Sequence, residues 1–124
     1  MRYLIDANCV IYLFADNHPK LTKRVEETAH GDIALSTIVF AELLMGVAHG
    51  KPPSPEALDD LPRQMPLIAF DEDAARAYAR LPFRRARFDR LLAGHALALN
   101  LPIITANPKD FADVPDLQVE DWTA

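Results

Sequence analysis

Short apolar runs alternate with longer amphipathic stretches along most of the chain. The runs have the length and composition of buried strands and lie at residues 2–5, 33–35, 67–70 and 102–105, with a weaker edge candidate at 117–119. The stretches between them place apolar side chains at helical spacing and predict helices over residues 7–14, 19–29, 38–48, 72–81 and 88–100. This alternation predicts a three-layer α/β fold, with helices on both faces of a mostly parallel sheet of four or five short strands.

One region departs from this alternation. Residues 51–66 contain five of the ten prolines, and we expect a loop-rich excursion with at most a short helical piece at residues 55–61. No repeat or low-complexity tract divides the sequence. We therefore predict one domain over residues 1–124.

Composition narrows the class of protein. A chain of 124 residues with 50% hydrophobic residues can bury a core of its own, and no apolar run approaches the length of a membrane-spanning helix. The acid at position 6 interrupts the N-terminal apolar run where a signal peptide would continue, so we expect a cytoplasmic protein without membrane association. The single cysteine, Cys9, excludes an internal disulfide and a cysteine-rich zinc site, and its apolar neighbours favour a core position.

The net charge of −5 at first argues against a nucleic acid partner. If four of the acids hold a cation, however, the rest of the chain carries a net charge of only −1. The basic residues are also bunched, at Lys20, Lys23 and Arg24 and again at Arg80, Arg84, Arg85, Arg87 and Arg90. The second group allows RNA phosphate contacts through Arg84, Arg85, Arg87 and Arg90, although a solvated basic face explains it about equally well.

Two acids fall at the sheet edge where α/β proteins bind ligands. Asp6 directly follows the first predicted strand, and Asp110 lies in the loop after the fourth. Ligands of such folds bind beyond the carboxyl ends of the strands. Taken singly, each could instead be an ordinary turn residue.

Two further acids interrupt apolar helices. Glu42 is the only charged residue between positions 38 and 48, so no polar face of that helix explains it. Asp89 opens a helix whose next turns are almost purely apolar, although the helix dipole also stabilises an acid in the first turn.

Four acids brought to one edge would repel one another, by about 3 kcal/mol per pair at ~5 Å and an effective dielectric near 20. A divalent cation would relieve this repulsion. Oxygen ligands without clustered His or Cys favour Mg²⁺ or Mn²⁺ over zinc. Such ions commonly serve phosphodiester hydrolysis, because they activate water and stabilise charge on the leaving oxygen.

Four segments in this order resemble one family. They are YLIDAN at 3–8, STIVFAEL at 36–43 followed by Gly46, FDRLLA at 88–93, and ITANPKDF at 104–111. Each motif is weak alone, but together they resemble the PIN-domain ribonucleases, and specifically the VapC toxins of bacterial toxin–antitoxin pairs, from Arg2 to Trp122.

The resemblance implies a PIN-like fold and a metal-dependent endoribonuclease that hydrolyses tRNA, rRNA or mRNA and so inhibits translation and growth. It implies that Mg²⁺ or Mn²⁺ is held by Asp6, Glu42, Asp89 and, less regularly, Asp110. Asn8 would support the ligands by a hydrogen bond, and Thr105 and Asn107 would line the site. It also implies a VapB-type antitoxin that neutralises the toxin, a toxin homodimer and a higher toxin–antitoxin assembly.

The chain also departs from the family pattern. The segment at 80–87 is shorter than in many relatives and lacks their usual glycine, and Gly94 replaces an expected alanine. These departures bear on substrate contacts more than on catalysis.

Three other interpretations stay open from the residues alone. A phospho-receiver domain would need an acidic neighbour beside Asp6, and a haloacid-dehalogenase-type phosphatase would need a second Asp at position 8, where this chain has Asn. A non-catalytic scaffold or RNA-binding module would not need the intact acids. Of the remaining candidates, we expect His95 to be a satisfied core histidine, and Trp122 to pack against the last strand or in an oligomer contact.

Overall fold

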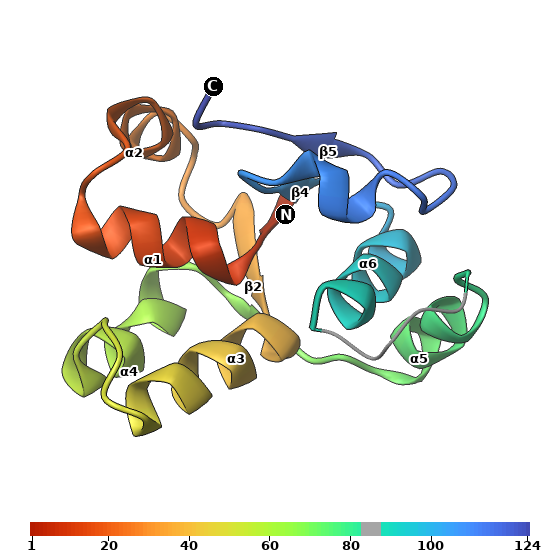
Figure 1. Ribbon diagram of the computed structural model, residues 1–124, viewed down its shortest axis with the longest axis horizontal. Helices are drawn as coiled ribbons and strands as arrows, with labels where there is room; N and C mark the ends of the chain where they lie inside the picture. The colour runs from red at the N-terminus through yellow and green to blue at the C-terminus, as the bar shows by residue number, and fades with distance from the viewer. Residues whose placement is uncertain (83–87) are drawn as a thin grey trace.

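The structure is a computed structural model that describes residues 1–82 and 88–124 (Figure 1). Five short strands form one parallel sheet in the order β3-β2-β1-β4-β5. Their bounds are β1 Tyr3–Ile5, β2 Ile33–Ser36, β3 Leu67–Ile68, β4 Ile103–Ile104 and β5 Val119–Glu120. The predicted α/β class with a mostly parallel sheet is confirmed.

The strand β1 lies at the centre of the sheet. Leu4 is in register with Ala34 of β2 on one side and with Ile103 of β4 on the other, and all three are fully buried. Since both faces of these strands are covered, they consist of apolar residues without alternation. Cys9 belongs to the same core, as expected.

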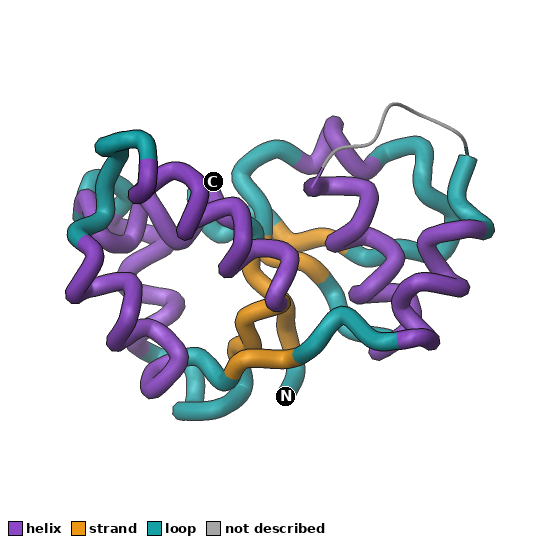
Figure 2. Tube along the Cα trace, turned by 90° about the horizontal axis from the view of Figure 1, so that it is seen from below, coloured by secondary structure: helices purple, strands orange, loops and turns teal. Residues whose placement is uncertain are grey.

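Helices cover both faces of the sheet (Figures 1 and 2). The first four lie on one side and the last two on the other, with a short 3₁₀ helix, η1, after β4. Their bounds are α1 Ala7–Ala15, α2 Pro19–Glu26, α3 Thr37–Ala48, α4 Pro55–Gln64, α5 Glu72–Ala79, α6 Phe88–Leu99 and η1 Pro108–Phe111. Among the described residues, no helix is long and apolar enough to cross a membrane.

The proline-rich segment forms a longer helix than predicted. The Ser54 side chain accepts a hydrogen bond from the backbone N–H of Ala57, and Pro55 occupies the first turn, where no backbone donor is needed. Leu58 and Leu61 then anchor the helix in the core. Proline content misled the prediction, because Pro55 suits the first turn of a helix and the helix continues through Pro62.

Gly94 allows a close approach of α5 and α6. A Cβ atom at this position would lie 2.7 Å from the Cα atom of Tyr78, which is too short for a real contact. The departure from the expected alanine is therefore explained by helix packing and not by the substrate.

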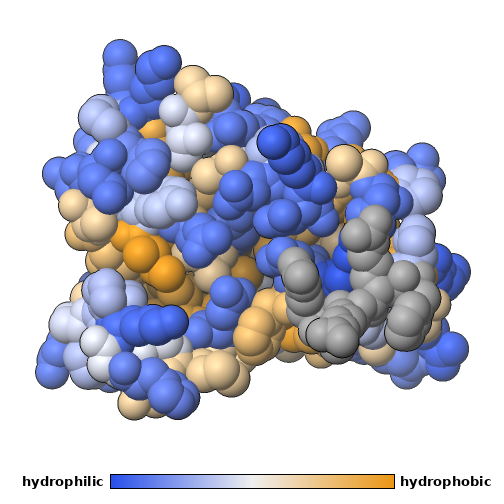
Figure 3. All heavy atoms as spheres, in the orientation of Figure 1, coloured by the Kyte–Doolittle hydropathy of each residue, from blue (hydrophilic) through white to orange (hydrophobic). Residues whose placement is uncertain are grey.

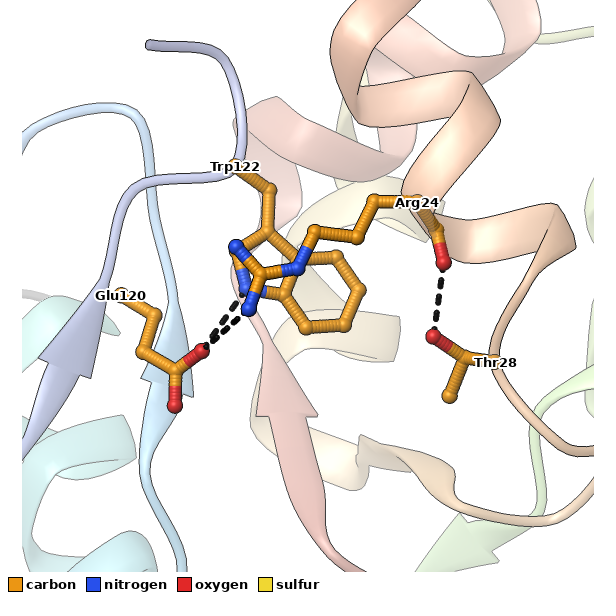
Figure 4. Close-up of polar contacts among 4 residues, drawn as sticks. All are labelled: Arg24, Thr28, Glu120 and Trp122. Carbon is orange, nitrogen blue, oxygen red and sulfur yellow. Dashed lines mark hydrogen bonds and ion pairs between the residues drawn. The ribbon is translucent and has the colours of Figure 1, made fainter.

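The C-terminal end of the chain is joined to α2 and β1 through Trp122 (Figure 4). Its buried indole meets the Tyr3 ring edge-on at 5.0 Å between ring centroids, and the guanidinium of Arg24 lies 4.4 Å above it. Glu120 accepts hydrogen bonds from the indole Nε1 at 3.0 Å and from Arg24 Nη2 at 3.1 Å. Trp122 thus contacts the last strand through its hydrogen bond to Glu120, while its ring packs against β1 and α2. The alternative of an oligomer contact stays a prediction.

Candidate active site

The predicted acids gather where the strand order reverses beside β1. Asp6 directly follows β1, Glu42 lies in α3 after β2, and Asp110 lies in η1 after β4. β1 lies between β2 and β4, so the connections that follow β1 and β4 leave in opposite directions at this edge. Ligands of open α/β sheets bind at such a point.

Asp6 is held in place by its neighbours. Its Oδ1 atom accepts a hydrogen bond from the backbone N–H of Cys9 at 2.8 Å and so caps α1, because the chain enters the helix from an extended residue. A side-chain hydrogen bond also joins it to Thr105. Burial nevertheless raises the pKa of the Asp6 carboxyl, and the nearby charge of Asp110 adds to the rise.

Glu42 has a similar surrounding. Its side chain is half-buried on α3, and burial is the main cause that raises its pKa. The charges of Asp89 and Asp6 raise the pKa further. Glu42 is therefore affected by Asp89 and Asp6, and Asp6 by Asp110, so the structure brings all four predicted acids into one electrostatic neighbourhood.

The residues of this cluster suit a divalent cation in their chemistry. All four candidate ligands are carboxylates, the donor type that Mg²⁺ and Mn²⁺ prefer. Burial and like charges raise the pKa of both Asp6 and Glu42, in Asp6 against hydrogen bonds that favour ionisation, and a cation would supply the missing opposite charge. Within residues 1–82 and 88–124, no group of three or more His, Cys, Asp or Glu side chains is arranged to hold a metal ion.

The three predicted supporting residues lie at this edge in different settings. Thr105 is fully buried, and its hydroxyl oxygen accepts a hydrogen bond from the backbone N–H of Asn107 at 3.0 Å. Asn107 itself is exposed. Asn8 is also exposed and lines a groove together with Glu42.

The prediction that the basic residues contact RNA needs one correction. Arg84, Arg85 and Arg87 lie outside the described residues. Arg90, predicted as an RNA contact, is buried, and its Nη2 atom lies 2.6 and 2.7 Å from the two carboxylate oxygens of Asp113. This ion pair joins the first turn of α6 to the segment after η1, so the guanidinium is engaged inside the protein.

A buried serine–histidine pair, which the sequence did not reveal, joins the start of α3 to α6. The Oγ atom of Ser36 lies 2.8 Å from Nδ1 of His95, and both residues are almost fully buried. The Phe70 ring meets the imidazole edge-on at 5.6 Å between centroids. His95 is a core residue, as predicted, and its Nδ1 atom has a side-chain partner 59 positions away that no local pattern indicates. It is not fully satisfied, because its buried Nε2 atom has no hydrogen-bond partner among the described residues.

A groove of about 420 Å³ runs between α1 and α3 (Figure 3). Apolar side chains gather in this hollow, and Glu42 and Asn8 line it too. The lining residues are Ala7, Asn8, Ile11, Glu42, Leu43, Met45, Gly46, His49, Lys51 and Pro52.

Comparison with known proteins identifies the relatives of this chain. The PIN domain family model matches residues 3–117. Ribonuclease VapC2 of Rickettsia felis is 30% identical over 132 residues, which cover 98% of each chain. The tRNA(fMet)-specific endonuclease VapC of Shigella flexneri is 24% identical, with 99% of each chain covered.

A solved structure has the same fold. The crystal structure of VapBC2 from Rickettsia felis, bound to a DNA fragment from their promoter, superposes on this chain with a TM-score of 0.81. The identity is 26%, and the alignment covers 98% of this chain and 99% of that one. The receiver and phosphatase interpretations are thereby set aside, because the chain belongs to the PIN domain family and, within it, to the VapC ribonucleases.

Proposed function

We propose that this chain is the toxin of a type II toxin–antitoxin pair and cleaves RNA with the help of Mg²⁺ or Mn²⁺. The observation that supports it best is the gathering of four acids at the carboxyl edge of the sheet in a chain of the VapC ribonuclease family. Asp6 is buried, Glu42 and Asp89 are half-buried and Asp110 is exposed. An excess of partly buried negative charge destabilises a fold, so its presence at a ligand edge favours a functional site.

Asp6, Glu42, Asp89 and Asp110 would hold the cation, which when bound supplies positive charge at the phosphate and an activated water. The side chains near Asp6 do not provide a nucleophile of their own. The Thr105 hydroxyl is buried and engaged with Asn107 and Asp6. Burial raises the pKa of the Cys9 thiol, which therefore stays protonated at neutral pH.

In this proposal, Thr105 supports Asp6. Its hydrogen bond to Asp6 favours the ionised carboxylate against burial. Together with the cap on Cys9, it fixes the direction of the Asp6 side chain. We infer that Thr105 keeps Asp6 oriented for the cation, as an outer hydrogen-bond partner does in other metal sites.

The test is cleavage of defined RNA by the purified chain. We expect total bacterial RNA, and initiator tRNA in particular, to be cut in millimolar Mn²⁺ or Mg²⁺, and cleavage to stop on addition of EDTA. Initiator tRNA is chosen because the Shigella relative is named for it. Asp6→Asn should remove cleavage in both metals. Cleavage that persists in EDTA, or in folded Asp6→Asn protein, would contradict the proposal.

The groove between α1 and α3 is where we place the antitoxin. Phe14, Leu44 and Met45 are large apolar residues exposed on these two helices, and a partner that covered them would remove apolar surface from water. A cationic side chain at the Glu42 end of the groove would offset the acids. The VapBC2 complex of Rickettsia felis supports such a partner.

Growth assays test the partner. Expression of the chain alone should arrest growth, and co-expression with the antitoxin encoded beside it should restore growth. Met45→Lys should weaken that rescue, whereas Leu67→Lys, a matched change at an exposed leucine on β3, should not. Normal growth with the intact, expressed chain would argue against toxicity.

We also expect the toxin to form a homodimer and to enter a higher assembly with the antitoxin. Light scattering after size exclusion measures both states. A chain that elutes as a monomer at micromolar concentration, with or without antitoxin, would contradict this expectation.

A further inference from the structure

The helices that contain Glu42 and Asp89 are joined by one buried hydrogen bond. Ser36 ends β2 and caps α3, since its Oγ atom accepts a hydrogen bond from the backbone N–H of Ile38 at 3.1 Å. The same Oγ atom lies 2.8 Å from Nδ1 of His95 in α6. The amino-terminal end of α3 faces α6 at this point (Figure 1).

The positions of the acids make this contact important. Glu42 follows Ser36 by six residues, and Asp89 precedes His95 by six residues. At about 1.5 Å per helical residue, each acid lies roughly 9 Å along its helix from the hydrogen bond. A shift of either helix at the Ser36–His95 contact would therefore change the separation of the two acids.

The surroundings of His95 leave it little freedom. The residue is 1% exposed, the Phe70 ring packs against it, and Phe70 is in turn held by a hydrogen bond from its backbone N–H to the Thr37 hydroxyl at 3.0 Å. Burial lowers the pKa of the imidazole, and the Asp71 charge and the Ala69 backbone oppose this shift only in part. The ring is thus neutral at pH 7, and its Nδ1 atom can accept a hydrogen bond from the Ser36 hydroxyl while the Ser36 oxygen accepts one from the Ile38 N–H.

We propose that Ser36 and His95 are positioning residues for the reaction: their hydrogen bond fixes α6 against α3 and so sets the spacing of Glu42 and Asp89. This inference rests on the proposed cation-dependent cleavage. Neither residue touches the substrate, and both act through the acids.

The experiment compares substitutions with and without this hydrogen bond. His95→Leu introduces an apolar side chain of similar size and removes the hydrogen-bond partner of Ser36. His95→Asn keeps a polar atom at the place of Nδ1, one bond beyond Cγ. We measure the thermal midpoint of the metal-free protein, Mn²⁺ affinity by calorimetry, and kcat and KM for RNA.

The expected result separates positioning from stability. His95→Leu should still fold, with a thermal midpoint moderately below that of the natural chain, because the buried Ser36 hydroxyl loses its acceptor. It should nevertheless bind Mn²⁺ and turn over RNA roughly tenfold to a hundredfold less well, with KM for RNA unchanged. His95→Asn should recover most of the Mn²⁺ affinity.

Ser36→Ala provides an independent test with a matched control. Both Ser36 and Ser54 cap a helix through their hydroxyls, but only Ser36 also bonds to His95. Ser36→Ala should reduce Mn²⁺ affinity and kcat as His95→Leu does, and Ser54→Ala should change neither. This comparison decides the matter even if His95→Leu does not fold.

Several results would overturn the inference. Folded His95→Leu protein with natural Mn²⁺ affinity and kcat would do so, as would equal losses in Ser36→Ala and Ser54→Ala. Failure of the proposed function looks different, because the unsubstituted chain would then neither bind Mn²⁺ nor cleave RNA in its presence.

Discussion

Two regions of the molecule place acids in opposite surroundings. At the C-terminal end, Glu120 lies beside a guanidinium and an indole N–H, and both donate to the same carboxylate oxygen (Figure 4). At the carboxyl edge of the sheet, Asp6 and Glu42 lie beside other acids, which raise their pKa values further. The first region pairs its negative charge with donors of the same chain, and the second gathers several negative charges together.

The difference separates structure from function. The contact between Arg24, Glu120 and Trp122 joins α2 to the end of the chain and needs nothing from outside. The acid edge is less favourable for folding, because burial and repulsion both oppose ionisation. If the proposed cation compensates this edge, substitutions in the two regions should have opposite signatures.

The largest effect is expected for Glu42→Gln. The amide keeps the size of the side chain but removes a candidate metal ligand and one of the clustered charges. Loss of about 4 kcal/mol of transition-state stabilisation would reduce RNA cleavage roughly 10³-fold. Urea unfolding of the metal-free protein at pH 7 should show no loss of stability.

The control for this substitution is Glu72→Gln on α5. Glu72 is exposed and forms an ion pair with Arg76 at 2.8 Å. Cleavage should be unchanged in Glu72→Gln. If Glu42→Gln destabilised the fold and still cut RNA, Glu42 would belong with Glu120 among the structural acids.

The next effect concerns the cation itself. A ligand that binds only the folded state stabilises it by about 2.7 kcal/mol at a hundred times its Kd. We therefore expect Mn²⁺ or Mg²⁺ to raise the thermal midpoint of the natural chain and of Arg24→Ala, but not of Glu42→Gln. Superimposable melting curves with and without millimolar metal would refute a shared cation site.

Part of this contrast could be predicted from the sequence. Asp6 is evident because an apolar strand ends on it, and Glu42 because it is the lone charge in an apolar helix. These are local signals. The helix α4 was underestimated, because a high proline content resembles a loop until the cap at Ser54 is seen.

The remaining features depend on contacts between distant positions. Arg90 seemed to belong to an exposed basic run, yet its partner Asp113 is 23 positions away and draws it inside. The bond between Ser36 and His95 spans 59 positions. Periodicity reports which face of an element is apolar, but it does not report which polar side chains meet in the core.

A smaller effect is expected for Arg24→Ala in the paired region. It removes a cation–π contact and an ion pair, but the Arg24 side chain is 52% exposed, so water already screens the charge. We expect a loss of about 1 kcal/mol in urea unfolding. RNA cleavage should be unchanged, and Arg24→Met, which keeps the apolar stem, should lose less. A cleavage defect in folded Arg24→Ala would break the separation between the two regions.

The smallest effect is the pH dependence of the metal-free protein. Because burial and like charges raise the pKa of Asp6 and Glu42 in the folded state, the folded chain binds protons at a higher pH than the unfolded chain. These two groups therefore make stability fall as the pH rises from their ordinary values, 3.8 and 4.5, through their folded values. His95 has the opposite effect: because burial lowers its pKa in the folded state, it makes stability fall as the pH drops below its ordinary pKa of 6.5.

The contribution of Glu42 is isolated by subtraction. Urea unfolding of the natural chain and of Glu42→Gln between pH 4 and 7 should show a difference that grows as the pH rises, because only the natural chain acquires the Glu42 charge. The half-burial of Glu42 keeps this difference small. With saturating Mn²⁺ the natural chain should instead gain stability as the pH rises, since a cation binds the ionised carboxylates. A pH profile that is the same in both proteins, with and without Mn²⁺, would show that Glu42 does not share the charge of the acid edge.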